Sequence, residues 1–199
     1  MNKGNWITNF RRFLPLLLMA LCPMLAQAHT VPGQSSGLAS GLSHPFSGLD
    51  HLLAMIAVGL WAAQRGGRML WVAPLTFVAV MAIGGALGMA GVSLPFVAGG
   101  IIASVLVLGV LVAAAIRLPM MASVAVLGLF ALFHGHAHGT EMSQSVSGIV
   151  YGSGFVLSTA ALHGLGIALG LAARQSGKGL AVRYAGAAIA VCGLALCLV

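Results

Sequence analysis

The sequence has very few charged residues, and almost none of them is acidic. Charged side chains make up 6% of the 199 residues, whereas a soluble domain carries about a quarter. So little charge cannot cover a surface that faces water, which excludes a soluble enzyme or binding domain. The net charge of +7 is not typical of a nucleic-acid-binding protein either, because the basic residues lie scattered at the ends of apolar segments. We therefore expect a protein of the lipid bilayer that does not bind nucleic acid.

Cysteine is also scarce, and three cysteines do not make a disulfide framework. Cys22 lies in an N-terminal segment that we expect to be removed. Cys192 and Cys197 lie in the last apolar segment, where they are best explained as small hydrophobic side chains. Soft thiolate ligands are therefore not expected in a metal site, which disfavours Cu(I).

Long apolar runs are abundant instead. Hydrophobic residues make up 60% of the chain, the mean hydropathy is +1.06, and the 28 glycines suit close helix packing in a membrane. Several runs approach the roughly 20 residues that a helix needs to cross a bilayer. The predicted fold is an all-α integral membrane protein with six transmembrane helices. We place them at about 45–63, 70–90, 95–116, 119–138, 147–173 and 180–199.

Residues 1–28 are predicted to be a cleavable signal peptide. A basic start is followed by an apolar stretch, and residues 26–28 (Ala-Gln-Ala) have the small side chains of a cleavage site. Cleavage would leave residues 29–199 as the six-helix transmembrane domain, with His29 at its N-terminus. An uncleaved first helix is the alternative, and it delivers the following residues to the same side of the membrane.

The basic residues predict the orientation. With the mature N-terminus in the periplasm, every basic residue after the signal peptide falls at the cytoplasmic end of a predicted helix. We therefore expect a multi-pass protein of the bacterial inner membrane. The residues that support this orientation are Arg65, Arg68, Arg117, Arg174, Lys178 and Arg183.

Both acidic residues lie in short histidine-rich stretches. Residues 44–51 read His-Pro-Phe-Ser-Gly-Leu-Asp-His, and residues 134–141 read His-Gly-His-Ala-His-Gly-Thr-Glu. Imidazoles together with carboxylates are ligands for divalent transition metals. A carboxylate near the bilayer is costly enough to indicate a functional site. Under the predicted orientation both stretches lie at the outer face.

Helical spacing suggests which of these side chains cooperate. On one helix His44 and His51 share a face, and Asp50 on the neighbouring stripe can turn toward the same pocket. On a second helix His134, His138 and Glu141 form one stripe, because they are spaced four and three residues apart. His136 points elsewhere. The predicted metal-binding residues are His44, Asp50, His51, His134, His138 and Glu141. The roles of His29 and His136 stay open.

His163 is a separate candidate in the fifth apolar segment. It lies about 24 Å along the helix from the outer start of that segment, past the bilayer centre. We expect it to be a further metal-binding residue on the way inward. The alternative is a buried histidine that only hydrogen-bonds to Ser158 or Thr159 nearby.

The two histidine-rich stretches resemble the two signatures of the HupE/UreJ family, and the apolar segments match that family over nearly the whole chain. The resemblance implies a hydrogenase or urease accessory protein that acts as a secondary nickel permease. It also implies that the six residues of the two stretches are the functional positions. Ni²⁺ would be the transported substrate rather than a bound cofactor, and Co²⁺ is the alternative that the resemblance leaves open.

Other functions remain open on the sequence. The protein can instead be a metal sensor or a haem-binding subunit without transport, and it can form homo-oligomers. A protease dyad of Ser153 and His163 explains neither histidine-rich stretch, and the ATP-binding pattern G-x-x-x-x-G-K-[ST] is absent. We therefore expect a permease and not an enzyme.

Overall fold

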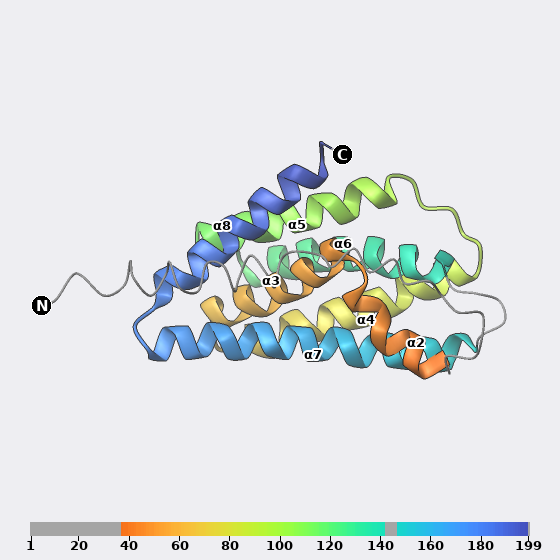
Figure 1. Cartoon of the computed structure of the whole chain (residues 1–199), viewed down its shortest axis with the longest axis horizontal. Helices are drawn as coiled ribbons and strands as arrows, with labels where there is room; N and C mark the ends of the chain where they lie inside the picture. The colour runs from red at the N-terminus through yellow and green to blue at the C-terminus, as the bar shows by residue number, and fades with distance from the viewer. Residues whose placement is uncertain (1–36, 142–146, 199) are drawn as a thin grey trace, which may run out of the picture. The chain divides into compact units, whose positions relative to one another are not determined.

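The computed structural model describes residues 37–141 and 147–198. By its contacts the chain divides into Met1–Gln34 and Ser35–Val199, and all described residues lie in the second unit. The described part is helical throughout (Figure 1). Its elements are α2 (Gly37–Ser43), the 3-10 turn η1 (His44–Phe46), α3 (Leu49–Arg65), α4 (Met69–Met89), α5 (Val97–Ala113), α6 (Met120–Glu141), α7 (Gly148–Gln175) and α8 (Gly179–Leu196). The predicted signal peptide lies outside the described residues and stays a prediction.

Six long helices, α3 to α8, correspond to the six apolar segments of the sequence. Four of them, α4, α6, α7 and α8, are long and apolar enough to cross a membrane. Helix α3 adds a fifth span only if it is counted together with α2 and η1, and α5 is apolar but has 17 residues. The all-helical membrane fold therefore has four to five candidate spans, and the count of six stays a prediction.

The first predicted span is broken rather than continuous. The segments Gly37–Phe46 and α3 meet at an angle of 78°. Between them Gly48 has an extended backbone (φ −108°, ψ 123°) and caps α3, and Pro45, which has no backbone N–H to donate, lies in the 3-10 turn. The expectation that His44 and His51 share one helix face is therefore wrong, because the chain turns sharply between them.

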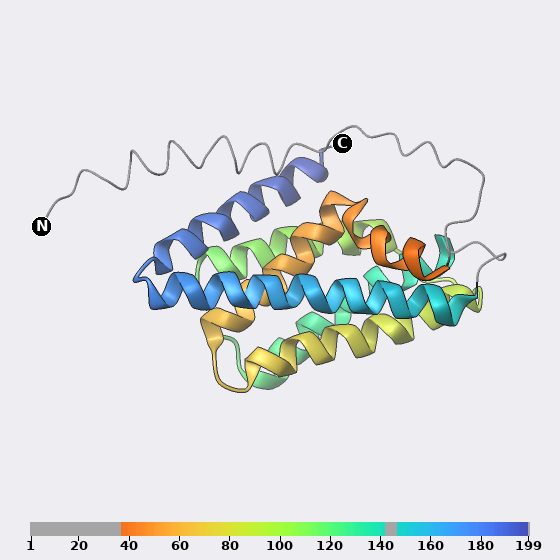
Figure 2. The same ribbon diagram turned by 60° about the horizontal axis from the view of Figure 1, so that its bottom comes forward.

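Helices α2 and α3 pack on α7 one after the other (Figure 2). A Cβ at Gly154 would collide with the backbone of α2, and a Cβ at Gly166 would collide with the backbone of α3. These two glycines lie about 18 Å apart along α7. Ser158 also donates a hydrogen bond to the carbonyl oxygen of Leu42 at 2.6 Å. Helix α3 therefore begins partway along α7, and His51 in its first turn is buried.

Glycines also bring α4 and α6 into backbone contact beside the second histidine-rich stretch. A Cβ at Gly135 would collide with the carbonyl oxygen of Met81, and a Cβ at Gly139 would collide with that of Gly85. Small residues that let helices approach this closely are a feature of membrane proteins. By contrast, a Cβ at Gly152 would meet nothing within 4 Å. The histidines of α6 are thus held against α4 by backbone contact.

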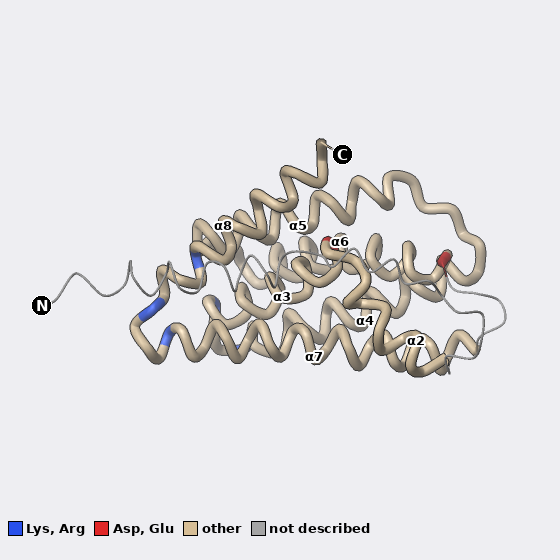
Figure 3. Tube along the Cα trace, in the orientation of Figure 1, with Lys and Arg blue, Asp and Glu red and all other residues tan. Residues whose placement is uncertain are grey.

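The basic residues of the described part gather at one end of the helices (Figure 3). Arg183 also completes the end of α5, where its Nε donates to the carbonyl oxygen of Ala113 at 2.8 Å. Arg65 donates to the carbonyl oxygen of Leu118 in the connection between α5 and α6. The last carbonyls of a helix need such partners. Their placement on the cytoplasmic side stays a prediction.

Candidate metal site

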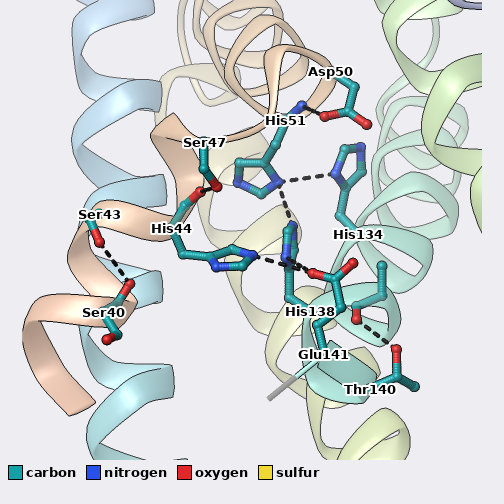
Figure 4. Close-up of polar contacts among 11 residues, drawn as sticks. Ser40, Ser43, His44, Ser47, Asp50, His51, His134, His138, Thr140 and Glu141 are labelled. Atoms are coloured by element: carbon teal, nitrogen blue, oxygen red, sulfur yellow. Dashed lines mark hydrogen bonds and ion pairs between the residues drawn. The ribbon is translucent and has the colours of Figure 1, made fainter. Parts of the chain in front are cut away.

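The two histidine-rich stretches come together where η1 faces the end of α6 (Figure 4). His44 Nε2 lies 3.4 Å from Glu141 Oε2, and His138 Nδ1 lies 3.5 Å from the same oxygen. The rings of His44 and His138 are edge-to-face with centroids 4.7 Å apart. Two imidazoles and one carboxylate therefore offer ligand atoms within 4.8 Å of one another. We call these three residues the outer triad.

A second set of ligand atoms lies next to the first. His51 Nδ1 is 3.2 Å from His134 Nδ1 and also 3.2 Å from His138 Nε2. The three imidazoles again have ligand atoms within 4.8 Å of one another, and we call them the inner triad. His138 belongs to both triads, because its Nδ1 faces Glu141 while its Nε2 faces His51.

Exposure to solvent falls from the outer triad to the inner one. The side chain of Glu141 is 59% exposed, that of His44 is 29% and that of His138 is 15%. His51 and His134 are 1% and 0% exposed. Burial strips water from an ion and strengthens its interaction with the remaining ligands. The arrangement is therefore graded from an accessible, negatively charged site to an enclosed site of neutral ligands.

Asp50 lies apart from both triads. Its Oδ1 accepts a hydrogen bond of 2.7 Å from the backbone N–H of His51, in the first turn of α3. In Figure 4 its carboxylate points away from the imidazole of His51. A helix N-terminus carries a partial positive charge, so Asp50 offsets that charge close to the inner triad. Asp50 therefore belongs to neither triad in the described residues, and its predicted metal binding stays a prediction.

His163 is as buried as His134 but belongs to neither triad. It is 0% exposed, and within the described residues neither ring nitrogen has a hydrogen-bond partner. Phe77 contacts the ring of His163 at a centroid distance of 5.3 Å and that of His134 at 5.8 Å. Phe77 therefore bridges His163 and the inner triad. Such a buried imidazole without partners is costly and calls for a functional explanation.

The remaining candidates are placed elsewhere. His136 Nε2 lies 2.6 Å from the carbonyl oxygen of Val92 in the α4–α5 connection and faces neither triad. His29 lies outside the described residues. Ser153 is exposed and donates to the carbonyl oxygen of Ile149 at 2.7 Å, about 15 Å along α7 from the buried His163. These two residues therefore cannot form a protease dyad.

Sequence reasoning missed the residues that surround the triads. Phe155 of α7 contacts the rings of His138 and His51 at centroid distances of 4.5 and 5.1 Å. Ser104 of α5 lies 2.8 Å from His134 Nε2. A single phenylalanine or serine in an apolar helix carries no motif, so only the tertiary contacts reveal that these residues belong to the site.

Comparisons with known proteins found a matching family model and a similar protein. Residues 17–196 match the family model described as HupE / UreJ protein. Protein HupE of Rhizobium leguminosarum bv. viciae is 47% identical over 176 residues, which cover 87% of this chain and 91% of that protein. No solved structure matches the chain.

Proposed function

Because this chain belongs to the HupE/UreJ family, we propose that it is a secondary transporter that moves nickel ions from the periplasm to the cytoplasm for hydrogenase or urease maturation. The observation that carries the proposal is the pair of donor triads joined by His138, with exposure falling from one to the other. Donor sets of imidazole and carboxylate suit Ni²⁺ and bind Co²⁺ less tightly.

Capture begins at the outer triad. Glu141 supplies a negative charge where water still has access, and His44 and His138 offer nitrogens that replace part of the water shell of the ion. Unit charges 4 Å apart attract by about 1 kcal/mol in bulk water and about 4 kcal/mol near a protein surface. An exposed carboxylate therefore attracts the ion without holding it too tightly to release.

Transfer to the inner triad uses the imidazole that the two triads share. The ion leaves Glu141, His44 and Nδ1 of His138 and binds Nε2 of His138 together with His51 and His134, all of them neutral imidazoles. The hydrogen of His138 moves from Nε2 to Nδ1 in this step, where Glu141 can accept the new hydrogen bond. Metal ligation requires deprotonated imidazoles, and acidification of the periplasmic side therefore lowers uptake. Asp50, at the start of α3, compensates the charge of the ion from a short distance without being a ligand.

The last step passes Phe77 and reaches His163. The two free nitrogens of His163 offer the ion a ligand on the cytoplasmic side of the inner triad. Because the chain has no ATP-binding pattern, the driving force must come from gradients across the membrane. A doubly charged ion gains about 4.6 kcal/mol per 100 mV of membrane potential, at about 2.3 kcal/mol per charge.

Uptake of radiolabelled nickel into proteoliposomes tests this proposal. Under an inside-negative potential, we expect His51→Ala to lower the initial rate at least tenfold. Removing even an outer partner of a metal ligand typically costs about that much in metal affinity or activity. His136→Ala is the matched control. It removes an imidazole of the same histidine-rich stretch, but this imidazole faces neither triad. Equal rates for wild type and His51→Ala would overturn the proposal.

The same vesicles separate transport from binding alone. A transporter releases nickel inside the vesicle, where a trapped chelator retains it, and uptake then exceeds the amount of protein. A sensor would bind no more than the protein can hold, whatever the potential. Competition by excess cobalt measures how far the protein discriminates between the two ions.

A further inference from the structure

Two hydroxyl side chains lie behind the inner triad, on the side away from its facing nitrogens. Ser104 Oγ of α5 lies 2.8 Å from His134 Nε2, and Thr159 Oγ1 of α7 lies 3.5 Å from His51 Nε2. Both hydroxyl residues are 0% exposed. Neither lies in a histidine-rich stretch, and neither can be a ligand in the place it occupies.

The hydrogen bonds of Ser104 decide which nitrogen of His134 carries the hydrogen. Ser104 Oγ lies 2.6 Å from the carbonyl oxygen of Ile101, which can only accept, so the single hydroxyl hydrogen points there. The lone pairs of Oγ are then left for His134, whose Nε2 must donate. A neutral imidazole has one N–H, and Nδ1 of His134 is therefore the bare nitrogen. This is the nitrogen that faces His51.

Thr159 contacts His51 from the opposite helix but does not impose the same tautomer. Its hydroxyl lies 3.5 Å from His51 Nε2 and 3.8 Å from the sulfur of Met81, which is a weak acceptor. Nδ1 of His51 lies 3.2 Å from the bare Nδ1 of His134, and two bare nitrogens make no hydrogen bond. These contacts are satisfied together when, in the ion-free protein, His51 carries its hydrogen on Nδ1, donates it to His134 and accepts at Nε2 from Thr159.

We propose that Ser104 is a positioning residue that keeps His134 in the tautomer with a bare Nδ1, so that His134 binds the transported ion through Nδ1. Only the identity of the ion rests on the proposed function, because the tautomer is a property of the ion-free protein. Metal-binding histidines commonly donate their second N–H to a carboxylate or carbonyl group. Neutral hydroxyls in that place add no negative charge to the buried site, which favours release of the ion.

The tautomer is measured by nitrogen NMR of the ion-free protein with ¹⁵N-labelled histidine, in detergent. We expect His134 to carry hydrogen on Nε2 in the wild type and in Ser104→Thr, which keeps the hydroxyl. In Ser104→Ala the resonances should shift toward the other tautomer or a mixture. Ser153→Ala is the control, because Ser153 makes a similar intrahelical hydrogen bond and, among the described residues, no hydrogen bond joins it to an imidazole. Hydrogen on Nδ1 in the wild type, or no change in Ser104→Ala, would overturn the inference.

Nickel affinity gives a second readout. Losing an outer partner of a metal ligand typically costs about 10- to 100-fold in affinity, and we expect Ser104→Ala to fall in this range. Ser104→Thr, which keeps the hydroxyl, should bind nickel as the wild type does. A Ser104→Ala protein that binds nickel as tightly as wild type would contradict the inference. A wild type that shows the expected tautomer but binds no nickel would refute the proposed function alone.

Discussion

The outer and inner triads share one histidine but differ in charge and in exposure. The outer triad includes Glu141, with a side chain that is 59% exposed, whereas the inner triad is made of imidazoles alone, and two of these are almost completely buried. An opposite charge is worth little in water and much more in the interior. A transporter that has its carboxylate ligand at the mouth and neutral ligands inside can therefore release the ion. A buried carboxylate would bind the ion too tightly.

The comparison also assigns different tasks to the two acids. Glu141 can touch the ion, because its oxygen lies within 3.5 Å of two imidazoles. Asp50 instead accepts a hydrogen bond from the backbone N–H of His51 in the first turn of α3, and we propose that it acts on the ion at a distance. The sequence places both acids beside histidines, yet only one of them contributes a ligand to a triad.

The largest effect is expected from removing the ligand that both triads share. His138→Ala leaves two ligands in each triad and removes the route between them. We expect nickel uptake to fall by about 100-fold or more. This loss exceeds what is typical when only an outer partner of a metal ligand is removed. His44→Ala should cost less, because it leaves the inner triad complete. Initial rates in proteoliposomes measure both variants, and a smaller loss in His138→Ala than in His44→Ala would contradict the shared role.

The backbone contact that holds the histidines of α6 can be broken without touching any ligand. Gly135→Ala forces a methyl group against the carbonyl oxygen of Met81. Such overpacking costs about 1–3 kcal/mol, so thermal unfolding in detergent should shift to a lower temperature. Gly152→Ala is the control, since its methyl group meets open space. Equal unfolding temperatures for the two variants would show that α4 and α6 do not approach this closely.

Asp50→Asn tests whether a charge that is not a ligand still assists transport. The side chain keeps an oxygen that can accept from the backbone N–H of His51 but loses its negative charge. We expect uptake to fall about tenfold, which corresponds to about 1.4 kcal/mol. X-ray absorption of the bound nickel should show the same number of nitrogen and oxygen ligands as in wild type. Loss of an oxygen ligand in Asp50→Asn would make Asp50 a ligand.

The smallest effect is expected at the exposed end. Glu141→Gln removes an exposed charge, and exposed ion pairs typically contribute about 0.2–1 kcal/mol. We therefore expect KM for nickel to rise a few-fold while the maximal rate stays close to wild type. Uptake measured over a range of nickel concentrations separates the two parameters. A fall in the maximal rate alone would place Glu141 in the transfer step.

The sequence was sufficient to predict the helical membrane fold and the two donor stretches, because hydropathy and residue type carry that information directly. It also correctly placed His134, His138 and Glu141 on one helix. The prediction of one continuous first helix was wrong, because the chain turns at Gly48 after the 3-10 turn that contains the proline. The sequence could not reveal Ser104 or Phe155, since their roles depend on helices that meet only in the folded protein.

Equilibrium dialysis of radiolabelled nickel with the purified protein tests the central claim most directly. The protein should carry an affinity tag without histidine and a His29→Ala background, so that the triads provide the measured sites. A neutral imidazole has one free lone pair, so His138 serves one triad at a time, and we predict about one ion per chain in the wild type. His138→Ala should bind nickel at least about tenfold more weakly. Undiminished binding by His138→Ala would contradict the claim that this histidine joins two sites for the same ion.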